Sequence, residues 1–102
     1  MIIQFAQDTI EKSAKPIVVS AFASWCPHCA RMKPILEEIE KEFGHKYTFT
    51  EFDIDESPKF TSQFEIHSIP TFIFIKDKQE VDRTMGEMSK EELIALIEKY
   101  LG

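Results

Sequence analysis

Trp25-Cys26-Pro27-His28-Cys29 is the most informative stretch of the 102-residue sequence, and it contains both cysteines. The preceding residues, Ile17–Phe22, are apolar and largely β-branched, which predicts a buried strand. The apolar residues that follow recur at helical spacing and predict a helix from Pro27 to about Phe43. Cys26 therefore lies at a strand-to-helix junction, where free backbone N–H groups and the positive end of the helix dipole favour a thiolate over a thiol.

The composition predicts one globular domain over residues 1–102, because 43% of the residues are hydrophobic, 29% are charged and only 3 are Gly. The net charge of −6, with no basic cluster, argues against nucleic acid and anionic membranes as partners. No apolar run approaches the roughly 20 residues that span a bilayer, and no signal-peptide pattern follows Met1. We therefore expect a cytoplasmic protein, and we expect it to be a monomer. In a reducing compartment a Cys-x-x-Cys pair beside a strand-helix unit indicates redox chemistry.

The rest of the chain predicts an α/β protein with the order β-α-β-α-β-α-β-β-α. Right-handed crossovers make the early strands parallel, and the short turn at 76–79 makes the last two antiparallel, so we expect a mixed sheet with helices on both faces. Ser57 is expected to cap a short helix, and Ser89 with Glu92 forms a capping box. The expected strands are 2–5, 17–22, 47–54, 71–75 and 80–85, and the expected helices are 8–13, 27–43, 57–64 and one that begins after Ser89.

Four landmarks in this order resemble the thioredoxin family over essentially the whole chain: Ala23–Cys29, Pro34, Ser68–Thr71 and Gly86. The resemblance implies the thioredoxin fold, a central mixed sheet flanked by helices. It also implies a cis peptide bond between Ile69 and Pro70 that faces the cysteines.

The resemblance further implies thiol-disulfide exchange that reduces protein disulfides. Cys26 would be the exposed nucleophile, and Cys29, more buried, would resolve the mixed disulfide. No cofactor motif is present, so the electrons would come from a separate thioredoxin-reductase-like donor. The residues that match the family's substrate-binding positions are Trp25, Ile69, Pro70 and Gly86.

Pro27-His28 departs from the commonest thioredoxin insert, which is Gly-Pro. The pair resembles the insert of DsbA, an oxidising periplasmic thioredoxin-fold protein. A histidine beside the thiolate can donate a hydrogen bond to it and stabilise the reduced form, so we predict a more oxidising pair than in an ordinary thioredoxin. The alternative is that His28 is an exposed loop histidine without this effect.

Ser20 stands where thioredoxins usually carry a buried Asp, and Glu51 aligns with the lysine that usually approaches that Asp. One hypothesis is that Glu51 supplies the missing carboxylate from the neighbouring strand, on the same face as a buried Phe49. Such a carboxylate would have a raised pKa and could act as a general base. The alternative is a half-exposed Glu51 with no catalytic part.

Other chemistries fit the sequence less well. A structural zinc site needs four ligands, and besides the two cysteines only His28, His45 and His67 are available. Glutathione use, as in glutaredoxins, is not expected, because Ser68-Ile69-Pro70 replaces the usual Thr-Val-Pro and the expected Gly-Gly turn is missing. Two further functions remain open: a DsbA-like oxidant or isomerase, and a non-enzymatic module that binds peptides in a groove beside Trp25 and Ile69.

Overall fold

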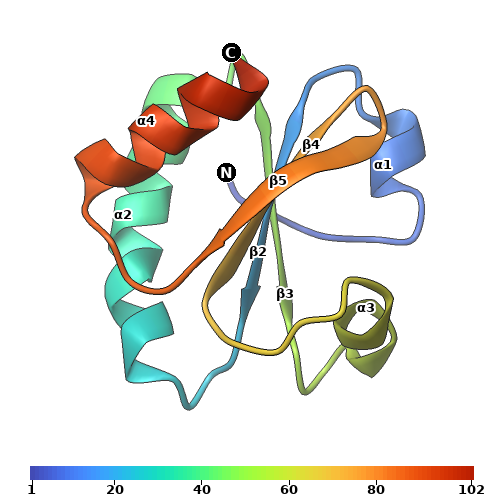
Figure 1. The fold of residues 1–102 in the computed structure, drawn as a ribbon, viewed down its shortest axis with the longest axis vertical. Helices are drawn as coiled ribbons and strands as arrows, with labels where there is room; N and C mark the ends of the chain where they lie inside the picture. Colours follow the sequence, from blue (N-terminus) through green and yellow to red (C-terminus); the bar gives the residue numbers. More distant parts are fainter.

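A five-stranded sheet runs through the middle of the molecule, and two helices cover each of its faces (Figure 1). The computed structural model covers residues 1–102. Helices α2 and α4 lie on one side of the sheet and α1 and α3 on the other. In chain order the elements are β1 (Ile3–Gln4), α1 (Thr9–Lys12), β2 (Ile17–Phe22), α2 (Pro27–Phe43), β3 (Thr48–Asp53), α3 (Pro58–Gln63), β4 (Thr71–Lys76), β5 (Gln79–Met85) and α4 (Lys90–Leu101).

The order of the strands in the sheet is β1-β3-β2-β4-β5. Strands β1 and β2 pair with β3 in parallel, while β4 is antiparallel to β2 and β5 is antiparallel to β4. The expected α/β class, element order and mixed sheet are therefore confirmed. The register sets Glu51 of β3 directly opposite Ser20 of β2. Because paired residues on neighbouring strands point to the same face, both side chains point to one side of the sheet.

Both faces of the sheet are buried, since the side chains of β2 alternate between two separate cores. Val18 belongs to the core under α2 and α4, and Val19 belongs to the core under α1 and α3. Aromatic rings fill much of the second core, where the ring of Phe52 contacts those of Phe5, Phe60 and Phe64. The remaining fully enclosed members of the first core include Met32, Ile39, Phe72, Phe74, Leu93 and Ile97.

The hairpin turn and the capping box follow the local sequence, but the expected cap at Ser57 does not form. Asp77 and Lys78 both have positive φ values, 53° and 66°, as a two-residue hairpin turn requires. The capping box of Ser89 and Glu92 is present at the start of α4. Ser57 precedes α3 as expected, but its side chain makes no capping hydrogen bond. Its ψ of 65° lies outside the extended region from which a capping side chain reaches the first turn.

The ends of the elements agree with the expected ones to within one residue. The first helix is limited to Thr9–Lys12 and the third strand to Thr48–Asp53. The peptide bond between Ile69 and Pro70 is cis, as the resemblance implies. None of the helices combines the length and the apolar character that a membrane crossing would need.

Candidate active site

The two cysteines lie at the start of α2, at the lower end of the sheet in Figure 1, where β2 ends. Cys26 is the N-cap residue with an extended backbone, and Pro27 occupies the first helical position, where no N–H is needed. The Sγ atom of Cys26 accepts a hydrogen bond from the backbone N–H of Cys29, at 3.2 Å. The sulfur of Cys26 thus takes the place that a serine or aspartate oxygen takes at an ordinary helix N-terminus. A thiolate gains most from this position, because the N–H groups and the helix dipole both favour negative charge.

The expectation that Cys26 is exposed and Cys29 more buried is wrong for this structure. The exposed fraction is 5% for Cys26 and 7% for Cys29, and both are free thiols. The reason is the capping hydrogen bond from the Cys29 N–H to the Cys26 Sγ atom, which turns the Cys26 side chain back toward the helix. There both sulfurs pack with Ala23, and Phe22, Ile54 and Ile69 lie against this small apolar group.

Burial raises the pKa of the Cys29 thiol to about 11, and the hydrogen bond with Cys26 adds to the effect. Cys29 is therefore a neutral thiol near neutral pH. It must lose its proton before it can attack a disulfide.

A cavity of about 270 Å³ lies behind the two thiols, and both cysteines line it. Glu51 and Lys33 contribute its charged groups, one from β3 and one from α2. Burial raises the pKa of Glu51; Lys33 acts in the opposite direction, and the negative charge of Glu37 adds to the increase. The raised pKa predicted for Glu51 is confirmed, and Phe49 is buried as expected. Glu51 itself is half-buried and lines the cavity.

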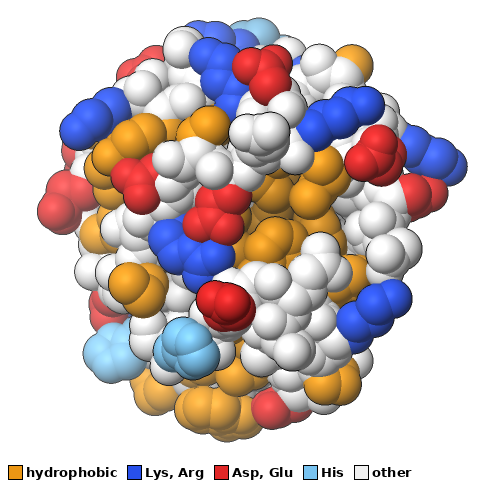
Figure 2. Space-filling view, turned by 45° about the vertical axis from the view of Figure 1, so that its right-hand side comes forward, with side chains coloured by type: hydrophobic (Ala, Val, Ile, Leu, Met, Phe, Trp, Pro, Cys, Tyr) orange, Lys and Arg blue, Asp and Glu red, His pale blue; other side chains and the backbone are white.

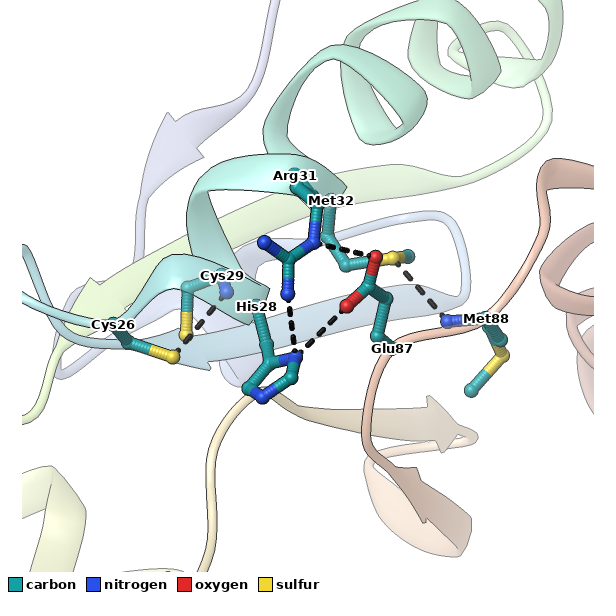
Figure 3. Close-up of polar contacts among 7 residues, drawn as sticks. All are labelled: Cys26, His28, Cys29, Arg31, Met32, Glu87 and Met88. Carbon is teal, nitrogen blue, oxygen red and sulfur yellow. Dashed lines mark hydrogen bonds and ion pairs between the residues drawn. The ribbon is translucent and has the colours of Figure 1, made fainter.

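The His28 ring has its hydrogen-bonding partners away from the sulfurs, contrary to the expectation of a bond to the thiolate (Figure 3). Its Nδ1 atom lies 2.8 Å from Oε1 of Glu87 and 2.9 Å from Nη2 of Arg31. Arg31 also donates from Nε to Oε2 of Glu87, at 2.8 Å. The hydrogen bonds with Arg31 and, to a smaller extent, with His28 lower the pKa of Glu87 to about 2, so Glu87 is a carboxylate at neutral pH.

The expected substrate-binding residues surround the thiols. Trp25 is 65% exposed, and its Nε1–H donates to Oδ2 of Asp55 at 2.7 Å, which fixes one edge of the indole. On the other side Gly86, with φ of 96°, donates its N–H to the carbonyl oxygen of Pro70 at 2.8 Å. Met85 is 58% exposed and extends the apolar surface here. Figure 2 shows apolar and histidine side chains together at this lower end of the molecule.

Several residues of the site were not predicted from the sequence. They are Arg31, Lys33, Asp55, Met85 and Glu87. Arg31 stands three residues after His28, so helical spacing places the two side chains together. Glu87 and Asp55 come from distant segments, and no local pattern marks them.

Comparison with known proteins agrees with the geometry. The family model described as Thioredoxin matches residues 4–99. The thioredoxin of Staphylococcus saprophyticus is 39% identical over 84 residues, which is 82% of this chain and 81% of that protein. The thioredoxin of Chlamydia trachomatis is 40% identical with the same coverage. The thioredoxin of Synechocystis is 35% identical over 97 residues, which is 95% of this chain and 90% of that protein. With the fold, the Cys-x-x-Cys cap and the cis proline in place, the chain belongs to the thioredoxin family.

Proposed function

We propose that this thioredoxin-family thiol-disulfide oxidoreductase reduces protein disulfides with Cys26 as the nucleophile and Cys29 as the resolving thiol. The observation that carries this assignment is the cap at the start of α2. The Sγ atom of Cys26 accepts the Cys29 N–H at the positive end of the helix, so the site favours charge on Cys26. Cys29 has the opposite character, with its pKa raised to about 11.

The reaction takes two exchanges. The Cys26 thiolate attacks one sulfur of the substrate disulfide, forming a mixed disulfide and releasing the other substrate sulfur as a thiolate. The Cys29 thiol loses its proton and attacks the Sγ atom of Cys26, which breaks the mixed disulfide and releases the second substrate thiolate. The substrate gains two electrons and two protons, while the protein retains a Cys26–Cys29 disulfide.

Glu51 is the proton acceptor for Cys29 in this proposal. Both side chains line the same cavity, whose volume of about 270 Å³ has room for water between them. Its raised pKa makes Glu51 a stronger base than an ordinary surface carboxylate. The register opposite Ser20 supports the same role, because it sets the carboxylate beside the strand position at which thioredoxins usually carry an Asp.

Trp25, Ile69, Pro70 and Gly86 form the surface against which a substrate chain lies in this proposal. The indole of Trp25 is exposed and its edge is fixed by Asp55. Ile69 packs against the small apolar cluster that contains the two cysteines. A chain laid between these groups would place its disulfide over Cys26.

Each turnover leaves both cysteines oxidised, so another protein must return two electrons. We propose a donor of the thioredoxin-reductase class, and a reducing compartment, the cytoplasm, as the place of action. We further propose that residues 1–102 work as one domain and as a monomer, because one chain supplies both thiols and the cavity behind them. Size-exclusion chromatography with light scattering tests the monomer, and cell fractionation tests the compartment.

The first experiment is reduction of insulin by the wild type, Cys26→Ser and Cys29→Ser. We expect activity only in the wild type, and we expect Cys29→Ser alone to accumulate a mixed disulfide. An active Cys26→Ser variant would refute the assignment, and an inactive wild type would favour a module that only binds peptides.

The equilibrium with glutathione then separates a reductase from a DsbA-like oxidant. The matched relatives carry the name thioredoxin. We therefore expect a potential closer to thioredoxin's, about −270 mV, than to DsbA's, about −120 mV. A value near the second would identify an oxidant.

A further inference from the structure

Three charged or titratable side chains form a closed cluster beside the thiols, and the established activity of the family does not account for it. His28 and Arg31 come from the first two turns of α2, and Glu87 comes from the loop between β5 and α4. All three contacts measure 2.8 or 2.9 Å. The cluster joins residues 56 and 59 positions apart in the sequence. It therefore ties the nucleophile's helix to the loop that follows Gly86.

The cluster gives the His28 ring a partner in both of its protonation states. A neutral ring with a free Nδ1 lone pair accepts from Nη2 of Arg31. A protonated ring instead donates from Nδ1 to the carboxylate of Glu87. A neutral ring that carries its proton on Nδ1 donates to Glu87 in the same way, so Nδ1 has a partner whether or not it bears a hydrogen. In neither state does the ring depend on Cys26 for a hydrogen bond.

We propose that Glu87, supported by Arg31, is a positioning residue that holds His28 away from the Cys26 thiolate and so keeps this Cys-Pro-His-Cys pair reducing. In Figure 3 the contacts of the ring run toward Glu87 and Arg31, and the two thiols lie on its other side. A histidinium engaged by Glu87 gives up part of its attraction for a thiolate, because its charge already has a partner. The reduced form then loses the stabilisation that a Pro-His insert can provide. The proposal rests on the assigned role of Cys26.

Arg31 determines the direction in which the His28 ring moves when the Glu87 carboxylate is lost. Without the carboxylate, a protonated His28 has a guanidinium next to its Nδ1 atom and no carboxylate to bond. Like charges repel, so the ring is driven away from Arg31 and becomes free to approach the Cys26 thiolate, which is two residues away in the sequence. Stabilising that thiolate stabilises the reduced form.

The test measures the equilibrium constant for oxidation of the dithiol by glutathione disulfide in a Glu87→Gln variant. Gln keeps the shape of Glu87 and removes its charge. We expect the constant to fall about tenfold, the factor given by one hydrogen bond to a charged group. The same substitution in a His28→Gln background should leave the constant within about twofold, because there is no ring to release. Glu98→Gln, an exposed site on α4, serves as the charge-matched control and should change nothing.

Two results would overturn the proposal. A constant that stays within twofold or rises in Glu87→Gln shows that Glu87 does not restrain His28. An equal fall in the His28→Gln background shows that Glu87 acts through its charge alone. Neither result depends on substrate reduction, so failure here is distinguishable from a failure of the Cys26 and Cys29 assignment, which the insulin assay detects.

Discussion

Replacing Glu51 with Gln should slow the second exchange step and leave the first unchanged. A thiol with a pKa of about 11 is ionised to about one part in 10⁴ at pH 7, against about one part in 100 at the ordinary value of 9.0. The largest cause of the shift is burial of the thiol. Cys29 therefore needs a base, and a positioned general base contributes about 10²-fold to 10⁴-fold. We expect Glu51→Gln to slow the resolving step about 100-fold at pH 7.

Stopped-flow reaction with an aromatic disulfide that releases a coloured thiolate separates the two steps. The first equivalent of colour reports attack by Cys26, and the second reports attack by Cys29 on the mixed disulfide. In the variant we expect a normal first phase and a slow second phase. The rate of the second phase should rise about tenfold for each unit by which the pH is raised from neutral, because hydroxide then removes the proton in place of Glu51. In the wild type this dependence should be weaker.

Glu38→Gln is the matched control, since it removes one exposed carboxylate from the same side of the molecule without touching the cavity. Both phases should equal those of the wild type. A second phase in Glu51→Gln within about threefold of the wild type would refute the reasoning. Cys29 would then lose its proton directly to solvent, and Glu51 would be a half-buried side chain without a catalytic part.

Three further predictions follow from the same structure. Phe52 is fully enclosed among Phe5 and other rings, so Phe52→Ala should lower the free energy of unfolding by about 3–5 kcal/mol. Urea denaturation measures this loss, and a loss below about 1 kcal/mol would contradict the packing. Asp55→Ala removes the acceptor of the Trp25 indole and should raise KM for insulin about fivefold, the effect of one ordinary hydrogen bond, without changing the reaction with a small aromatic disulfide. Because burial raises the pKa of Glu51, its ionised form destabilises the fold at neutral pH, and this penalty vanishes as the pH falls below the unfolded-state pKa of about 4.3. Glu51→Gln should therefore raise the urea midpoint at pH 7 but leave it unchanged at about pH 3.

Local sequence was sufficient for the order of the elements, and the resemblance to thioredoxins supplied the expected site residues. The β-branched run before Cys26 predicts the buried strand β2. The apolar residues after Cys26 recur at helical spacing and predict α2, because they form one buried face of a helix. Pro27 and the capping box at Ser89 mark helix starts through chemistry that involves only neighbouring residues. Glu51 was found because a position usually occupied by lysine carries the opposite charge.

The mistaken expectations concern side-chain direction. Whether Cys26 is exposed depends on the rotamer that its cap imposes and on packing with Ala23 and Ile69, neither of which leaves a pattern in the sequence. The partner of His28 lies 59 residues away, in a loop without periodic structure. A hydrogen bond of this kind is specified by the folded backbone, so sequence spacing cannot reveal it.

Under the proposed restraint of His28 by Glu87, the insert between the cysteines does not set the redox character of the pair by itself. Stabilisation of a thiolate by His28 requires the ring to be free to approach the sulfur, and that freedom depends on Glu87, which the insert does not contain. A chain with the same Pro-His pair and no acidic residue after the glycine that follows β5 would leave its histidine unrestrained. By this reasoning the residue after that glycine should decide whether a Cys-Pro-His-Cys protein of this family acts closer to a reductase or to an oxidant.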